Sequence, residues 1–332
     1  MNLNNKSILL TGGTGSFGRQ FLQNVVNKYK KIKRLVIFSR DEFKQFELPK
    51  KFNTTKYPFL RFFVGDVRDK ERLKSTLKEI EIVIHSAALK QVPTAEYNPF
   101  EYINTNVIGA ENLIQACLES NVKKVIALST DKAVAPINLY GATKLCSDKL
   151  FIAANNIKGK QDILFTVVRY GNVMSSRGSI VPFFQELSKK QDFLPITDLR
   201  MTRFNISIES AVNFVIKCLK IAKGGEIFVP KIPSYKVTDL AKAINNNCKF
   251  KIIGKRPGEK IHEEMITIND SYNTLEFKDY FIIASSDKLN DYKKSYKNAK
   301  LVKENFSYTS ENNKDFLNIK KIKDLIKKGQ KI

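Results

Sequence analysis

Short apolar runs alternate with longer amphipathic stretches through the first half of the chain. The runs that predict buried strands are SILLTGG, RLVIFSR, LRFFVGD, IEIVIHSAA, VKKVIALST and LFTVVRYGN. Between them, stretches such as FGRQFLQNVVNKY, DKERLKSTLKEI and NVIGAENLIQACLESN place apolar residues at helical spacing. Apolar strands that alternate with helices are typical of a doubly wound parallel sheet with both faces covered, so we expect an α/β fold.

The pattern changes after residue 171. NVMSSRGSIVPFF and LPITDLRMTRF are loop-rich, whereas SIESAVNFVIKCLK and GEIFVP predict a helix and a strand that return to the first layer. A smaller mixed region follows and ends in NIKKIKDLIKKGQKI, which predicts an amphipathic helix with a basic face. We therefore predict a main domain, residues 1–171 plus about 207–230, and a smaller, discontinuous C-terminal domain, about 172–206 plus 231–332. The expected site is the cleft between them.

Composition narrows the class of protein. The 332 residues are 42% hydrophobic and 27% charged, which suits a globular protein with a sizeable core. No apolar run approaches the ~20 residues of a membrane span, and the first one is too short for a secretory leader, so we expect a cytoplasmic protein. The formal net charge is +24, but the lysines are scattered and interleaved with acidic residues. This distribution favours an anionic small substrate over nucleic acid.

The cysteines and histidines point away from metal chemistry. No CxxC pair occurs, so neither structural zinc nor a disulfide framework is expected from Cys117, Cys146, Cys218 and Cys248. We predict that Cys146 is buried filler in a helix, with a reactive thiol as the alternative. His85 lies in a predicted buried strand and is expected to pack in the core. Since His262 is the only other histidine, we predict no metal site.

The segment LLTGGTGSFGRQF carries Gly12, Gly15 and Gly18 between a predicted strand and a predicted helix. Glycines here let a pyrophosphate approach the backbone, and the helix N-terminus offers amides and a positive dipole end. Glycines also mark plain turns, but the strand–turn–helix context favours dinucleotide binding by a Rossmann-type domain. The loop residues expected to join these glycines at the cofactor are Thr14, Ser16 and Phe17.

The tip of the second predicted strand, in VIFSRDEFK, bears on the choice of dinucleotide. An NAD site usually places an acidic residue at this tip to hold the ribose hydroxyls. Here the tip is Ser39 and Arg40, with Lys44 one turn on, and a hydroxyl with two cations suits a 2′-phosphate. We therefore predict NADP. Asp41 leaves NAD open, and a solvated Arg40 at a strand end is the purely structural alternative.

The ends of the third and fourth predicted strands complete the cofactor prediction. Asp66 and Val67 end the third strand, where folds of this kind usually hold the adenine. The alternative for Asp66 is a cap of the helix that follows. Ala87 and Ala88 follow the fourth strand and belong to the predicted cofactor contacts.

The stretch LSTDKAVAPINLYGATK, residues 128–144, carries the candidate catalytic chemistry. Tyr140 and Lys144 are spaced to share one helix face. A phenol titrates near ~10, and a nearby ammonium and a cationic nicotinamide stabilise the phenolate. Tyr140 can then take a proton from a substrate hydroxyl while hydride leaves for the cofactor. Ser129 and Thr130 at the preceding strand end make this common spacing specific.

Asp131 and Lys132 stand just upstream as an acid and an amine side by side. A simple dehydrogenase does not need this second pair, so the pair raises the question of a further chemical step. The structural alternative is Asp131 as a helix cap and Lys132 as a surface cation.

Together these segments resemble the extended short-chain dehydrogenase/reductase superfamily. Within it, the chain is similar to the inverting UDP-N-acetylglucosamine 4,6-dehydratases that open pseudaminic acid biosynthesis. The resemblance covers nearly the whole chain and rests on TGGTGSFG, FSRDEFKQ, GDVRD, AALKQVP, EYNPFE, STDKA, INLYGATKLCSDKLF, VVRYGNV, SRGS, MTRF, GGEIFVPKIPS and RPGEKIHE.

The resemblance implies a dehydration. Hydride leaves carbon 4 of the sugar with Tyr140 as base, the 4-ketone acidifies the proton at carbon 5, the carbon-6 hydroxyl leaves as water, and hydride returns to carbon 6. The elimination needs a second acid–base pair. Our hypothesis makes Asp131 the acid toward the hydroxyl and Lys132 the carbon-5 base, with a lowered pKa. Retaining relatives generally carry Asp-Glu here, and membrane-anchored ones with Asp-Lys tend to have Met in place of Tyr140, so we expect the inverting branch.

The resemblance also implies a UDP-sugar site in the smaller domain. Cations in its loops, Lys260 among them, suit two phosphates, although each arginine taken singly is typical of a solvated surface. The residues to which the resemblance points are Lys90, Asn172, Arg177, Thr202, Arg203, Arg256 and Glu259. The chain departs from the family pattern at Gln91, Ser175 and Asn205, and two of these, Gln91 and Asn205, bear on contacts with the sugar ring.

We therefore expect an NADP-dependent UDP-N-acetylglucosamine 4,6-dehydratase that inverts carbon 5 and acts as a homo-oligomer, a dimer or a hexamer. The first alternative is a retaining dehydratase or a sugar-nucleotide epimerase on the same fold. The second is a non-catalytic nucleotide-sensing or RNA-binding protein. The complete set of Tyr140, Lys144, Asp131 and Lys132 argues against this second alternative.

Overall fold

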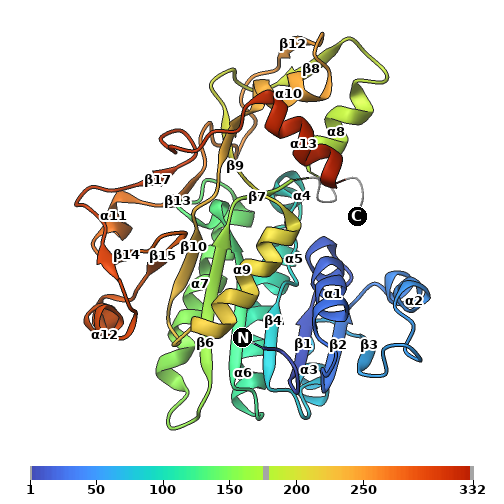
Figure 1. The fold of residues 1–332 in the computed structure, drawn as a ribbon, viewed down its shortest axis with the longest axis vertical. Coiled ribbons are helices and arrows are strands. Elements are labelled where there is room, and N and C mark those ends of the chain that lie inside the picture. The colour runs from blue at the N-terminus through green and yellow to red at the C-terminus, as the bar shows by residue number, and fades with distance from the viewer. Residues whose placement is uncertain (1, 175–178, 330–332) are drawn as a thin grey trace.

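In the computed structural model, which describes residues 2–174 and 179–329, a ten-stranded sheet forms the body of the molecule (Figure 1). Its order is β16-β14-β15-β10-β6-β5-β4-β1-β2-β3. From β10 to β3 every neighbouring pair is parallel. These strands are β1 (Ser7–Thr11), β2 (Arg34–Ser39), β3 (Leu60–Val64), β4 (Ile82–His85), β5 (Lys124–Thr130), β6 (Leu164–Tyr170) and β10 (Ile227–Pro230). The predicted doubly wound α/β fold is therefore confirmed.

Both faces of the central parallel strands are buried, which explains why their sequences are mostly apolar, whereas β3 at the edge of the sheet is partly exposed. Alternate residues of a strand point to opposite faces. In β1, Ile8 and Leu10 join the core under one helical layer, and Leu9 joins the core under the other. Helices α1 (Ser16–Lys28) and α9 (Ile208–Ile221) form the first layer, and the second contains α3 (Lys70–Thr76), α6 (Gly109–Leu118) and α7 (Leu139–Ile157) (Figure 1).

The segment NVIGAENLIQACLESN, predicted as one helix, divides into a π-helical turn and α6. The turn, η1 (Asn104–Ile108), carries Asn106, whose buried side chain exchanges two hydrogen bonds of 2.9 Å with the backbone of Leu89 and donates to Thr143 at 3.0 Å. Asn106 thus ties the loop after β4 to α7. The other short helices of the first half are α2 (Glu42–Lys51), α4 (Val92–Tyr97), α5 (Pro99–Ile103) and the 3₁₀ turn η2 (Asp131–Ala133).

Three strands from the last part of the chain extend the sheet beyond β10. They run antiparallel to their neighbours and are β15 (Tyr280–Ile283), β14 (Thr274–Glu276) and β16 (Lys300–Leu301). Their connections contain α11 (Ile268–Ser271), η3 (Ser286–Lys288) and α12 (Leu289–Ser295).

Smaller elements gather above the carboxyl ends of the parallel strands, at the top of Figure 1. They form the sheets β11-β9-β7, β12-β8 and β13-β17 with helices α8, α10 and α13. Their bounds are β7 (Asn172–Val173), α8 (Ile180–Leu187), β8 (Phe193–Ile196), β9 (Thr202–Ile206), β11 (Ser234–Lys236), α10 (Val237–Ile244), β12 (Lys249–Ile252), β13 (Glu264–Ile266), β17 (Tyr308–Thr309) and α13 (Ile319–Gly329).

The amphipathic helix predicted at the end of the chain is α13. Its buried residues Ile322 and Ile326 pack with Leu240 of α10, and lysines lie on the exposed face. Within the described residues, we find no helix with the length and apolar character needed to cross a membrane.

Candidate active site

A cleft of about 680 Å³ opens at the carboxyl ends of the parallel strands, where loops from successive strands converge. It runs from the glycine-rich loop after β1 to the start of α7. The predicted site residues that line it are Gly12, Thr14, Gly15, Ser16, Phe17, Ser39, Arg40, Lys44, Val67, Ala87, Ala88, Lys90, Thr130, Asp131, Lys132, Tyr140, Lys144 and Asn172. The structure therefore brings most of the predicted cofactor and catalytic residues together.

The glycine-rich loop is shaped to receive a phosphate group. A Cβ at Gly18 would lie 2.2 Å from the carbonyl oxygen of Gly13, so only glycine lets α1 start this close to the loop. The N-cap of α1 is Gly15, which has no side chain to cover the helix amides. The hydroxyls of Thr14 and Ser39 are 2.9 Å apart and join the loop to the tip of β2. These features fit the pyrophosphate of a dinucleotide.

The charged residues at the tip of β2 are engaged with neighbouring carboxylates. The Arg40 guanidinium lies 3.7 Å from Asp66, and the Lys44 ammonium pairs with Asp41, which also caps α2. Arg40 is therefore not a purely solvated side chain. Burial alone would raise the pKa of Asp66, but hydrogen bonds from Arg68 and the charge of Arg40 lower it.

The alternative prediction for Asp66, that it caps the following helix, is wrong. Asp69 caps α3, because its side chain accepts a 2.9 Å hydrogen bond from the amide of Arg72. Among the described residues, Asp66 and Gly18 are outside the lining of the cleft, whereas Val67 belongs to it.

Helix α7 carries Tyr140 and Lys144, and both side chains are buried where they meet the cleft. The helix starts at Asn138, whose side chain accepts a 2.7 Å hydrogen bond from the amide of Gly141. A Cβ at Gly141 would lie 2.2 Å from the carbonyl oxygen of Lys132. This glycine therefore allows α7 to pack against η2, and it brings the tyrosine–lysine pair beside the second acid–amine pair.

A buried acid that we did not predict lies one turn beyond Lys144. The Asp148 carboxylate accepts a 2.7 Å hydrogen bond from the Ser129 hydroxyl and pairs with Arg169 at 3.4 Å. Burial lowers the pKa of Lys144, and the charge of Asp148 opposes that effect. Burial raises the pKa of Tyr140 to about 12.

The Thr130 hydroxyl joins the two acid–base pairs. It interacts with the Tyr140 phenol and also donates a 2.9 Å hydrogen bond to Oδ1 of Asp131. Its oxygen accepts a 3.3 Å hydrogen bond from the amide of Lys132 and so caps η2. Because Thr130 is the cap and Asp131 is completely buried, the helix-cap alternative for Asp131 is wrong.

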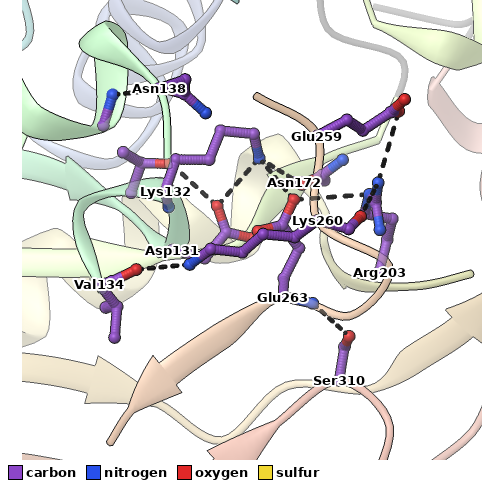
Figure 2. A network of polar contacts seen from close by, with 12 residues as sticks. Asp131, Lys132, Val134, Asn138, Asn172, Arg203, Glu259, Lys260, Glu263 and Ser310 are labelled. Atoms are coloured by element: carbon purple, nitrogen blue, oxygen red, sulfur yellow. Dashed lines mark hydrogen bonds and ion pairs between the residues drawn. The ribbon is translucent and has the colours of Figure 1, made fainter. Parts of the chain in front are cut away.

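Figure 2 shows the Lys132 ammonium surrounded by three acceptors. Nζ lies 3.1 Å from Oδ1 of Asp131, 3.3 Å from Oε1 of Glu263 and 3.4 Å from Oδ1 of Asn172. An ammonium has three donors, so each acceptor can engage one of them. The alternative prediction of Lys132 as a surface cation is therefore wrong.

The expectation that Lys132 has a lowered pKa is also wrong. Burial alone would lower it, but the negative charges of Asp131 and Glu263 raise the pKa of Lys132 above its ordinary value. Burial raises the pKa of Asp131. Burial would also raise the pKa of Glu263, but the charges of Lys132 and Arg203 lower it. These directions favour an ammonium at Lys132 and a charged carboxylate at Glu263.

Two residues that were predicted to bind the sugar nucleotide, Arg203 and Thr202, pack against Glu263 and Ser310. The Arg203 guanidinium donates to the carbonyl oxygens of Thr202, Ile261 and Lys260, and its Nε lies 3.5 Å from Glu263. The Thr202 hydroxyl lies 2.7 Å from that of Ser310. Both side chains are buried, and neither is among the described residues that line the cleft.

The remaining predicted sugar-nucleotide residues divide by position. Lys90 and Asn172 line the cleft. Glu259 accepts a 3.1 Å hydrogen bond from Thr197, and Arg256 is exposed in the loop after β12, both outside the described lining. Arg177 and Ser175 lie outside the described residues. Of the other departures from the family pattern, Gln91 lines the cleft and Asn205 is buried in β9.

The predictions for the cysteines and histidines have mixed outcomes. The prediction that Cys146 is buried is wrong, because its side chain is exposed on α7. His85 is buried in the core, as predicted, with its Nδ1 2.8 Å from the Thr11 hydroxyl. His262 lies behind the cleft, with its Nδ1 2.8 Å from the Thr202 hydroxyl.

Comparison with known proteins finds a matching family, similar sequences and a similar solved structure. The family described as polysaccharide biosynthesis protein matches residues 8–285. UDP-N-acetylglucosamine 4,6-dehydratase (inverting) of Campylobacter jejuni subsp. jejuni serotype O:2 is 54% identical over 330 residues, which covers 97% of this chain and 98% of the relative. UDP-glucose 4-epimerase of Rickettsia bellii (strain OSU 85-389) is 40% identical over 330 residues, which covers 97% and 95%. The X-ray structure of Pen from Bacillus thuringiensis matches with a TM-score of 0.90 and 38% identity, and all of both chains is covered.

Proposed function

The chain belongs to the family of polysaccharide biosynthesis proteins, and we propose that it is an inverting UDP-N-acetylglucosamine 4,6-dehydratase of pseudaminic acid biosynthesis. One observation carries this proposal: a single cleft holds both the pair Tyr140–Lys144 and the pair Asp131–Lys132. The first pair suits hydride chemistry at a sugar hydroxyl, and the second suits the loss of water. The 54% identity to an inverting dehydratase supports the choice of substrate.

Different parts of the cleft bind different parts of the reactants. The glycine-rich loop and the tips of β2 to β4 would hold a nicotinamide dinucleotide, which would supply the hydride acceptor and donor for carbons 4 and 6. Lys90 and Asn172 line the same cleft, and Asn172 lies beside Lys132, so these two side chains would contact the sugar nucleotide. The strands and helices above the sheet supply its remaining contacts.

Each side chain has a defined task in this reaction. The Lys144 ammonium stabilises the Tyr140 phenolate, which takes the proton of the carbon-4 hydroxyl and becomes a phenol. Asp131 holds a proton for the carbon-6 hydroxyl, which its raised pKa supports. Lys132 removes the carbon-5 proton after its ammonium has passed a proton to Glu263, its other carboxylate partner, because Asp131 already holds one. The raised pKa of Lys132 makes this transfer necessary. A proton that comes from solvent then adds to carbon 5 on the opposite face and gives the inverted sugar.

We propose NADP as the preferred dinucleotide. Ser39 and Arg40 line the cleft at the tip of β2, and Asp41, the acidic alternative, caps α2. Arg40→Ala is therefore expected to weaken NADP binding about tenfold and to leave NAD binding nearly unchanged. Calorimetric titration of both dinucleotides tests this. Equal losses for the two would show that Arg40 does not read the 2′-phosphate.

Incubation of the protein with UDP-N-acetylglucosamine in deuterated water tests the proposed function. No reductant is added, because the hydride is returned within each turnover. We expect the loss of one water, deuterium at carbon 5 and L-arabino geometry by NMR and mass spectrometry. Loss of water with the original geometry would assign the chain to the retaining dehydratases. Unchanged substrate with bound cofactor would overturn the substrate assignment.

An epimerase is the second candidate function, because the Rickettsia bellii UDP-glucose 4-epimerase is 40% identical to this chain. Epimerisation at carbon 4 needs only the hydride pair and conserves the mass of the sugar. It would leave Asp131 and Lys132 without a chemical task. The same incubation separates the two functions, since only the dehydratase product is lighter by one water.

A further inference from the structure

Glu263 is a buried acid that lies directly behind the candidate dehydration pair. It precedes β13 and is only 3% exposed. Its amide donates a 2.9 Å hydrogen bond to the Ser310 hydroxyl, and its carbonyl oxygen accepts one from the Ser310 amide at 2.7 Å. This double contact holds the Glu263 backbone in place. A glutamate is rarely this buried without charged partners.

The partners of Glu263 are two cations, one of which is Lys132. Its Oε1 lies 3.3 Å from Nζ of Lys132 and 3.5 Å from Nε of Arg203. Arg203 is itself held by backbone carbonyls, so it is a rigid support for Glu263. Oε2 finds no hydrogen-bond partner within the described residues. Figure 2 shows the chain of contacts from Arg203 through Glu263 to Lys132 and Asp131.

Two carboxylates therefore compete for the same ammonium. We propose that Glu263 is a positioning residue for the dehydration step: it supplies the negative charge that balances Lys132 and so leaves Asp131 to hold the proton for the leaving hydroxyl. This inference rests on the proposed function. It assigns a role to a residue that lies outside the described lining of the cleft and acts through Lys132 and Asp131.

The charges around Glu263 support this division. When two acids share one site, the environment separates their pKa values and fixes which one is charged. Here the pKa of Asp131 is raised and that of Glu263 is lowered. The titratable groups that face Glu263 are Asp131, Lys132, Arg203, Tyr235 and Lys260. The cations among them outnumber the acids, which favours a charged Glu263.

Replacement of this glutamate by glutamine removes the charge and keeps the size. Asp131 is then the remaining anionic partner of Lys132, so the apparent pKa values of Asp131 and Lys132 both fall. Asp131 then holds its proton less firmly than it does in the wild type. We expect elimination to slow about 10- to 100-fold, within the range of a lost general acid. The pH optimum of elimination moves to lower pH, and the hydride step at Tyr140 keeps its rate.

The test measures the two steps separately in Glu263→Gln. In single turnovers, the absorbance of the reduced nicotinamide is expected to rise at the wild-type rate and to decay about 10- to 100-fold more slowly. Glu264→Gln is the matched control. Glu264 is the next residue in the chain, and its carboxylate pairs with neither Lys132 nor Arg203 among the described residues. This variant is expected to match the wild type. An unchanged decay rate and pH profile in Glu263→Gln would overturn the proposal.

Two further results keep the test decisive. Equal slowing of both steps in a folded Glu263→Gln protein would show a general structural effect and overturn the positioning role. If Glu263→Gln does not fold, Glu263→Asp decides, because it keeps the charge but draws it back from Lys132. We expect slower decay there with a smaller pH shift, and wild-type kinetics would overturn the proposal. Absence of dehydration by the wild-type protein would instead refute the proposed function.

Discussion

Acid should destabilise this protein largely through one buried imidazole. His85 ends β4 and is 2% exposed, with Nδ1 2.8 Å from the Thr11 hydroxyl and its ring against Phe151. Burial, reinforced by the charge of Lys144, lowers the pKa of His85 to about 3. In the unfolded chain the same imidazole titrates near ~6.5. Folding therefore requires neutral His85 wherever the pH lies between these two values.

The sign and size of the effect follow from this difference. Because the folded pKa is depressed, the stability contribution is complete above about pH 6.5 and is lost as the pH falls toward about 3. Each pH unit in that window costs about 1.4 kcal/mol. We therefore expect a loss of about 2 kcal/mol at about pH 5 and of up to about 5 kcal/mol at about pH 3. These are large fractions of the ~5–15 kcal/mol typical of a folded domain.

Urea unfolding of the wild type and of His85→Asn at about pH 7.5 and about pH 5 measures this contribution. The asparagine side chain can still meet the Thr11 hydroxyl but does not titrate. Other titrating groups are common to both proteins, so they cancel in the difference between the two free energies of unfolding. The stability advantage of the wild type is expected to shrink by about 2 kcal/mol between the two conditions. Parallel pH dependences would refute the assignment to His85.

Three substitutions test the cleft. Gly18→Ala places a Cβ 2.2 Å from the Gly13 carbonyl oxygen and so pushes α1 away from the glycine-rich loop. Calorimetry should show that dinucleotide binding is weakened at least about tenfold. Wild-type affinity would contradict the need for this close approach. Tyr140→Phe should lower turnover at least about 100-fold while cofactor affinity is kept, and substantial turnover would exclude Tyr140 as the base. The negative charge of Asp148 raises the pKa of Lys144, and Asp148→Asn removes that charge. The pH–rate profile should therefore move to lower pH. An unchanged profile would show that Asp148 and Lys144 are not coupled.

The parallel sheet could be predicted because its signal is local. Strands β1, β2, β4, β5 and β6 are buried on both faces, so their sequences are mostly apolar. The antiparallel strands β14 and β16 lack this signal because they are only three and two residues long. The π-helical turn η1 also has no periodic pattern of its own, since it continues directly into α6.

Site residues could be predicted where one short segment carries the chemistry. Tyr140 and Lys144 meet because a helix places residues four apart on one face. Asp148 continues the same helix face, and that spacing was the signal by which it could have been found. The exposure of Cys146 follows from the same geometry, because this residue lies on another side of α7.

Glu263 had no such signal, and it changes the interpretation of Lys132. The two residues are far apart in the sequence and meet only because β13 is folded against η2. From the sequence, Asp131 was the only acid known to lie beside Lys132. The hypothesis required an amine with a lowered pKa because it made Lys132 the carbon-5 base. It also gave one buried carboxylate two tasks, to neutralise an ammonium and to hold a proton for a leaving group, and these conflict. A second carboxylate removes that conflict, because Glu263 takes the charge and Asp131 can keep the proton.

Buried counter-charges also explain how one cleft can carry out two proton transfers, one at Tyr140 and one at Asp131. Tyr140 has to lose a proton easily, whereas Asp131 has to hold one, and Thr130 contacts both side chains. The structure separates the two tasks by their buried counter-charges. Asp148 lies behind Lys144 on the tyrosine side, and Glu263 lies behind Lys132 on the aspartate side. Asp148→Asn should therefore impair the hydride step and spare the elimination, and Glu263→Gln should do the reverse. The opposite pattern of effects would contradict this division.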